Sequence, residues 1–70
     1  MYAKDMYIYD GGKSIPLTEE LGLNPYDRLE EERIEPPQGM GYGSTVYLVE
    51  GTDRRVRISV YSGWSQAEIC

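Results

Sequence analysis

The sequence of 70 residues contains no histidine and no phenylalanine, and its single cysteine, Cys70, is the last residue. Histidine is the commonest general base and a usual zinc ligand, so its absence removes the familiar hydrolytic and zinc-binding arrangements. No serine or cysteine nucleophile has an evident base beside it. One thiol cannot form a disulfide within the chain, which favours a reducing compartment. We expect a protein that is not an enzyme and holds no cofactor or metal.

Long hydrophobic runs are missing as well. No apolar segment approaches the ~20 residues that cross a bilayer, and the first residues lack the apolar stretch of a signal peptide. A chain of 70 residues allows one domain, because domains seldom fall below ~50 residues. We expect a single cytoplasmic domain over residues 1–70 with no membrane partner. A core of this size supplies only ~3–5 kcal/mol, so a homodimer is an open expectation.

The strongest structural signal is a hairpin over residues 44–61. Two runs rich in β-branched residues, 44–50 and 54–61, flank the turn Gly51-Thr52-Asp53. A three-residue loop would place Leu48 opposite Val56, which makes one face of the pair apolar. That face would hold the following aliphatic residues: Val46, Leu48, Val56, Ile58 and Val60.

Weaker signals precede the hairpin. Residues 2–9 predict a strand, and Asp10-Gly11-Gly12 predicts a turn, because glycine reaches positive φ without a steric cost. Residues 13–17 predict a short return strand, which Pro16 confines to an edge of the sheet. The tail from Gly63 onward is too short to classify.

A helix is predicted after residue 24. Asn24 suits the N-cap, Pro25 suits the first helical position, and the run must end before Pro36. The apolar face of this run is thin, so residues 26–35 are either a surface helix or a strand. A single helical turn is also predicted just before Gly22. Together these elements predict an α+β fold, a small antiparallel sheet of three or four strands around the hairpin with one short helix.

The net charge of −5 comes from one stretch, residues 19–35, which holds seven acids and two arginines. In one interpretation this carboxylate row occupies a basic groove that is built for phosphates. In the other it is a solvated surface, with Arg55 and Arg57 as internal counter-charges. A divalent-cation site is disfavoured, because the spacing and the glycine of a calcium loop are absent.

Large side chains supply candidate anchors for a partner. Tyrosine combines an apolar ring with a hydroxyl, which suits half-exposed contact positions, and large residues in glycine-rich loops are frequent contact points. The candidate partner-binding residues are Glu30, Glu31, Glu32, Glu35, Tyr26, Met40, Tyr42 and Trp64. The acidic chain repels nucleic acid, so we expect no direct nucleic-acid binding. The expected partner is a protein or ribonucleoprotein complex with a basic surface.

Three short segments resemble the swapped-hairpin pattern of the AbrB/MazE family: Gly12-Lys13-Ser14-Ile15-Pro16, Leu21-Gly22-Leu23 and Tyr26-Asp27-Arg28-Leu29-Glu30. In that family a short strand ends in Ile-Pro and a helix ends in Leu-Gly before a turn and another strand. The resemblance covers residues 12–30. It implies a small dimeric transcriptional regulator or antitoxin that binds DNA.

In type, the chain is also similar to the small inhibitor proteins that phages make against host defences, of which anti-CRISPR proteins are the best known. The shared features are short length, acidity, absence of histidine and many tyrosines. This resemblance implies steric blockade of a host complex, in some cases by imitating the charge of nucleic acid. We therefore expect a stoichiometric protein-binding inhibitor, anti-CRISPR-like, whose acidic surface blocks a nucleic-acid-binding site. The alternative expectation is the AbrB-like regulator.

Overall fold

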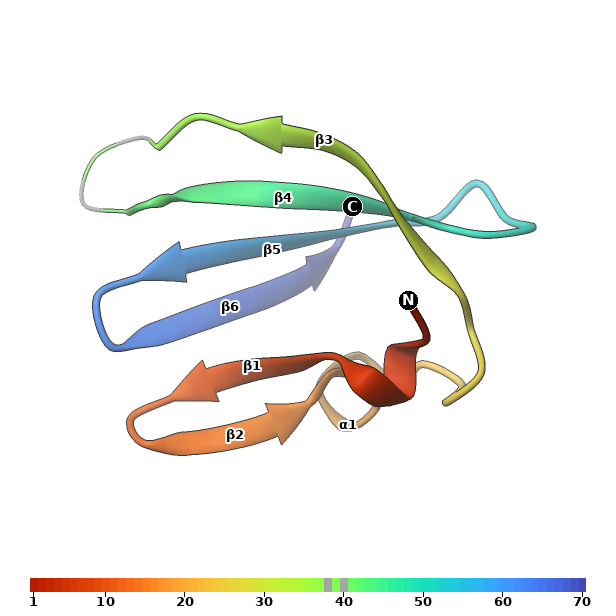
Figure 1. Cartoon of the computed structure of the whole chain (residues 1–70), viewed down its shortest axis with the longest axis horizontal. Helices are drawn as coiled ribbons and strands as arrows, with labels where there is room; N and C mark the ends of the chain where they lie inside the picture. The colour runs from red at the N-terminus through yellow and green to blue at the C-terminus, as the bar shows by residue number, and fades with distance from the viewer. Residues whose placement is uncertain (38, 40) are drawn as a thin grey trace.

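A computed structural model describes residues 1–37, 39 and 41–70 of the chain. Within these residues, six antiparallel strands form one sheet in the order β2-β1-β6-β5-β4-β3 (Figure 1). The strands are β1 (Tyr7–Asp10), β2 (Lys13–Pro16), β3 (Leu29–Glu35), β4 (Gly43–Val49), β5 (Arg55–Tyr61) and β6 (Trp64–Ile69). A single 3-10 turn, η1 (Ala3–Asp5), and one short helix, α1 (Leu17–Leu21), complete the described elements.

The expected α+β fold with three or four strands is therefore wrong, because the described chain is mostly β. One additional strand is β6, which forms from the unclassified tail. The other is β3, so of the two alternatives for residues 26–35 the strand is correct and the helix is wrong. Asn24 and Asp27 close a turn instead, with the Asp27 N–H donating to the Asn24 carbonyl at 3.0 Å. Pro25 thus occupies the second position of a turn, a site that it favours as much as the first turn of a helix.

The predicted hairpin is confirmed as β4 and β5, but its predicted register is wrong by one residue. Tyr47, and not Leu48, pairs with Val56. The connecting loop is longer than expected, because the Val49 N–H donates to the Arg54 carbonyl at 3.0 Å and the intervening residues form the turn. Inside this turn the hydroxyl of Thr52 donates to the Val49 carbonyl at 2.8 Å. A shift of one residue in the register changes which side chains of the two strands share a face of the sheet.

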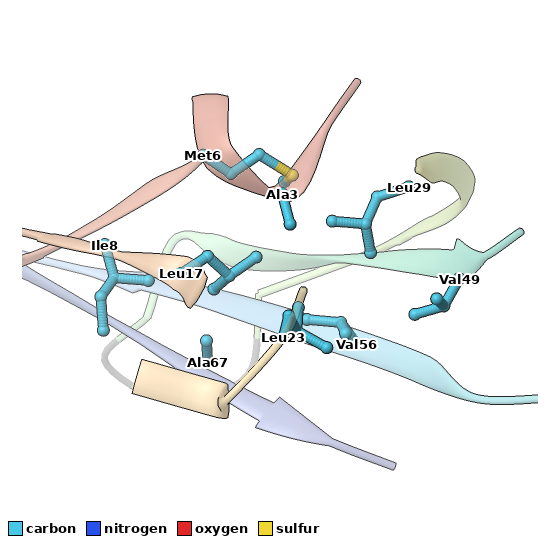
Figure 2. Close-up of a cluster of buried hydrophobic side chains, with 9 residues drawn as sticks. All are labelled: Ala3, Met6, Ile8, Leu17, Leu23, Leu29, Val49, Val56 and Ala67. Carbon is cyan, nitrogen blue, oxygen red and sulfur yellow. The ribbon is translucent and has the colours of Figure 1, made fainter. Parts of the chain in front are cut away.

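The core follows the observed register. Val56 now shares a face with Tyr47, while Val46 and Leu48 lie on the other face beside the arginines of β5. The expected single apolar face is therefore wrong. The buried cluster joins sheet residues to the N-terminal segment (Figure 2): Ala3, Met6, Ile8, Leu17, Leu23, Leu29, Val49, Val56 and Ala67.

The N-terminal elements agree in part with expectation. The strand predicted over residues 2–9 is confirmed only from Tyr7, because residues 3–5 form the turn η1. The short edge strand before Leu17 is confirmed as β2, and the helical turn before Gly22 is confirmed as α1. Gly22 ends α1 in the left-handed conformation, with φ at 67°.

The connections divide between two ends of the sheet (Figure 1). The turn between β1 and β2, the turn between β5 and β6, and the segment between β3 and β4 lie at one end. The loop between β4 and β5 lies at the opposite end. The edges of the sheet are the short strand β2 and the longer strand β3, so β3 presents the longer exposed edge.

Candidate functional site

The face of the sheet opposite the core carries a ladder of ion pairs. Arg55 Nε donates to both carboxylate oxygens of Glu32, at 2.9 and 3.0 Å. Arg57 Nε donates to Glu35 Oε1 at 2.8 Å. These pairs join β5 to β3 across the intervening strand β4. They confirm that Arg55 and Arg57 serve as internal counter-charges for part of the acidic stretch.

Further contacts extend the ladder into a network. Arg57 Nη1 donates to Glu68 Oε1 of β6 at 3.2 Å. The register of β3 shifts at a β-bulge. Next to the bulge, Arg33 lies 3.0 Å from Glu32 and 3.5 Å from Glu35. The open face is therefore close to neutral, although it contains most of the acids of β3.

The arginines lower the pKa of two glutamates below the ordinary value of 4.5. A hydrogen bond from Arg55 is the largest cause at Glu32, and a hydrogen bond from Arg57 is the largest cause at Glu35. Desolvation opposes the shift at both carboxyls without reversing it. The same contacts raise the pKa of both guanidinium groups. Both pairs consequently stay ionised in mild acid.

Acidification is expected to destabilise the fold through these two pairs. Because the folded-state pKa values of Glu32 and Glu35 lie below 4.5, their stabilising effect is complete above that pH. It is lost as the pH falls through the lowered folded-state values. Thermal denaturation from about pH 7 to about pH 2.5 should show a constant Tm down to about pH 5 and a decline below it.

The double variant E32Q/E35Q should have a lower Tm at neutral pH and a shallower decline in acid. The matched control is E19Q/E20Q on α1, where the structure shows no ion pair among the described residues. This control should keep the acid response of the unaltered chain. If the Tm of E32Q/E35Q declines in acid as steeply as the Tm of the unaltered chain, the ion-pair ladder does not stabilise the fold.

Glu30 and Glu31 differ from the acids that follow them. Both side chains are exposed, and neither makes an ion pair within the part of the chain that the structure describes. Glu30 pairs with Leu48 and Glu31 pairs with Tyr47, so the two carboxylates point to opposite faces of β3. The predicted acidic surface is thus divided into two carboxylates held by arginine and two that remain free.

The predicted aromatic anchors do not form one cluster. Trp64 is 43% exposed and stacks on Tyr61, with ring centroids 4.1 Å apart and planes at 12°. Tyr42 is 69% exposed at the same end of the sheet, where its N–H donates to the Val60 carbonyl at 2.8 Å. Met40 lies outside the described residues.

Tyr26 lies apart from these residues, in the turn that precedes β3 at the opposite end of that strand (Figure 1). Its ring meets Tyr2 edge to face, with centroids 6.2 Å apart, and the ammonium of Lys4 lies 5.2 Å from its centroid. These three exposed residues form a small local cluster of their own. Tyr26 therefore does not share a contact surface with Tyr42 and Trp64.

A groove of about 490 Å³ occupies the end of the open face beside the segment that joins β3 to β4. Its lining residues are Glu35, Pro36, Gly41, Gly43, Ser44, Arg57, Ser59, Val60 and Tyr61. The hydroxyls of Ser44 and Ser59 lie 2.9 Å apart and bond to each other. The pair between Glu35 and Arg57 also lies here. The groove is thus polar and charge-balanced.

Glu35 is the one described groove residue among the predicted partner-binding residues, and that prediction did not include the two serines or Tyr61. The available signal was the alternation of Arg55, Arg57, Ser59 and Tyr61, which places four polar side chains on one face of a strand. In the residues that the structure describes, no group of three acidic or thiol side chains could hold a metal ion. The arrangement is suited to contact with another molecule through charge and hydrogen bonds.

Comparisons with protein-family models, with curated proteins and with solved structures give no match to this chain. Residues 12–30, which carry the AbrB/MazE resemblance, run from the turn before β2 through α1 to the start of β3. None of the helices in the described part of the chain has the length and apolar character needed to cross a membrane.

Proposed function

We propose that this chain is a stoichiometric protein-binding inhibitor of a macromolecular complex, and that β3 covers a basic, nucleic-acid-binding surface of that partner. A phage anti-CRISPR-like inhibitor would have this activity. The observation that carries the proposal is the line of carboxylates on an exposed edge strand. Glu30, Glu31 and Glu32 occupy three successive positions of β3, and Glu35 follows at its end.

The spacing of these charges supports the proposal. A β-strand rises ~3.3 Å per residue. One strand of duplex DNA carries one phosphate charge per ~3.4 Å of helix axis. Three successive glutamates therefore follow this edge at a rise close to the phosphate spacing, with Glu31 on the core side, Glu30 on the open face and the carboxylate of Glu32 held by Arg55. A surface lined with lysine and arginine would be attracted to this edge.

The ion-pair ladder supports a protein partner over nucleic acid. Arg55 and Arg57 are the arginines of β5 that would face a phosphate, and both are held by Glu32 and Glu35. The net charge of −5 adds long-range repulsion from any polyanion. The same charge accelerates encounter with a basic protein surface.

Reversal of the free carboxylates is expected to weaken partner binding at least tenfold. The test compares E30K/E31K with E19K/E20K, a control on α1 that changes the net charge by the same amount. All four side chains are exposed, so both variants should keep the fold, since surface substitutions usually change stability by only ~0.5 kcal/mol. Each protein is immobilised through its one exposed thiol, Cys70, and exposed to extract from cells that carry the gene.

The unaltered chain and E19K/E20K should each retain one nucleic-acid-binding complex at equal stoichiometry. Added in solution, the chain should release labelled nucleic acid from that complex. E30K/E31K should do neither at comparable concentration. Equal retention by both variants, or a retained complex that keeps its nucleic acid, contradicts the proposal. Salt-sensitive binding of duplex DNA by the chain alone would contradict it and favour the AbrB-like regulator.

A further inference from the structure

The geometry of the sheet edge points to a specific mode of binding. We propose that the partner contributes a short, extended, basic segment that pairs as an added strand with the free edge of β3 between Glu31 and Ile34. The inference rests on the proposed function and specifies how β3 engages its partner. Strand addition uses main-chain hydrogen bonds for affinity and alternate side chains for specificity.

The start of the outer edge of β3 is already paired. The Leu29 N–H donates to the Met1 carbonyl at 2.7 Å, and the ammonium of Met1 donates to the Leu29 carbonyl at 3.0 Å. Val49 lies opposite Leu29 on β4, and its N–H bonds instead to the carbonyl of Arg54, the residue just before β5. The backbone groups of Leu29 therefore point away from β4, toward the edge.

The same phase continues along β3. Residues opposite each other in antiparallel strands alternate between pairs that exchange hydrogen bonds and pairs that do not. Glu31 pairs with Tyr47 and Ile34 pairs with Thr45, which are positions of β4 that direct their backbone groups to β5. The N–H and C=O of Glu31 and of Ile34 consequently point outward. Among the described residues, no hydrogen bond from a turn, loop or cap reaches these groups.

The β-bulge maintains this phase across the gap. The register shifts between Glu31 and Arg33, where Glu32 is the extra residue of the bulge. The backbone N–H and C=O of Glu31 before the bulge and of Ile34 after it therefore both point away from β4. Glu31 and Ile34 both project toward the core side, where Ile34 is 70% exposed. The other carboxylates of the strand, among them Glu30 and Glu32, project toward the open face. A pairing strand would thus place its cations on the open face and apolar side chains beside Ile34.

A second copy of this chain fits the same edge less well than a basic segment. Antiparallel pairing of two β3 strands with Glu31 opposite Ile34 would bring Glu32 to Arg33, but it would also set Glu30 of each strand against Glu35 of the other, and like charges in opposite positions are destabilising. A charged edge is a common protection against self-association. The same charges attract a strand rich in lysine or arginine, so the edge favours the basic segment over the copy.

The probe for this inference is the capped hexapeptide acetyl-(Arg-Val)3-amide, titrated into the labelled full-length chain and followed by amide NMR signals. Binding should slow hydrogen exchange at Glu31 and Ile34. N-methylation of the three valines should weaken binding at least tenfold. When the arginine side chains lie on the open face, the valine N–H groups are the donors that face β3, and methylation removes them. N-methylation of the three arginines should weaken it less than threefold. Both modified peptides keep the full charge, and acetyl-(Glu-Val)3-amide should not bind.

A variant of the chain gives an independent measurement. I34P removes one outward N–H, changes no charge, and leaves the hydrogen bonds to β4 in place, as proline permits on an edge strand. It should weaken binding of the basic peptide at least tenfold. If I34P does not fold, the methylated peptides still decide the question on the unaltered chain.

The outcomes separate this inference from the proposed function. Equal binding of the two methylated peptides, or undiminished binding to folded I34P, overturns strand addition. If E30K/E31K still loses the nucleic-acid-binding complex, the proposed function stands without that mode of binding. If the peptide pairs as expected but the chain retains no such complex, strand addition stands and the proposed function is wrong.

Discussion

Leu29→Ala is expected to unfold most of the protein at room temperature. Leu29 is 1% exposed and lies in the buried cluster that joins β3 to the N-terminal segment (Figure 2). Replacement of a buried leucine by alanine costs ~2–5 kcal/mol, through lost transfer free energy and the cavity that remains. A domain of this size has only ~3–5 kcal/mol of net stability from its core. The loss is therefore comparable to the whole free energy of unfolding.

Circular dichroism and thermal denaturation measure the result directly. L29A should show a sharply reduced transition, or none, together with loss of the dispersed amide signals of the native sheet. Two controls isolate the cavity. L29M nearly preserves volume and should cost less than ~1.5 kcal/mol. I34A removes an aliphatic side chain that is 70% exposed on the same strand, so it should change stability by only ~0.5 kcal/mol. A cooperative transition in L29A within a few degrees of the original would contradict the assigned role.

Residues near Leu29 also show where sequence reasoning reached its limit. The run Glu30-Glu31-Glu32-Arg33 suits a helix by local propensity, and only one buried leucine marks it as a strand. Its conformation is set by hydrogen bonds to β4 and by Arg55 and Arg57, which lie more than twenty residues away. Such non-local pairing leaves no periodic signal in the run itself.

The hairpin shows the complementary case. Its strands were predictable, because β-branched residues concentrate in two runs around a turn. Its register was not, because the hydroxyl of Thr52 closes a longer loop than the shortest turn would need. That single residue of register decides whether Val46 and Leu48 join the core or lie beneath the arginines. The site followed the same rule: Arg55 and Arg57 were predictable counter-charges, but their choice of Glu32 and Glu35 depends on the bulge in β3.

Gly43→Ala is expected to cause the second large loss of stability, at the point where the groove meets β3. Gly43 has φ at +109°, a conformation that side chains with a Cβ rarely adopt, and a Cβ there would lie 2.9 Å from the Glu35 carbonyl oxygen. Backbone held in such a region costs ~1–3 kcal/mol. The contact adds to this cost, because its partner is backbone that is paired within the sheet and cannot rotate away.

Gly63→Ala is the matched control, since Gly63 has φ at +80° and a Cβ there would meet nothing within 4 Å. G63A therefore carries the conformational cost alone, whereas G43A carries the contact as well, and denaturant midpoints should rank G43A below G63A. Hydrogen exchange should quicken at Glu35 and Ser44 in G43A only, because the added Cβ pushes the end of β3 away from β4. The pair between Glu35 and Arg57 would loosen with it, so the depressed pKa of Glu35 should rise toward 4.5 in G43A and not in G63A. Equal midpoints for the two variants would mean that the close approach of Gly43 to Glu35 does not hold this end of β3 in place.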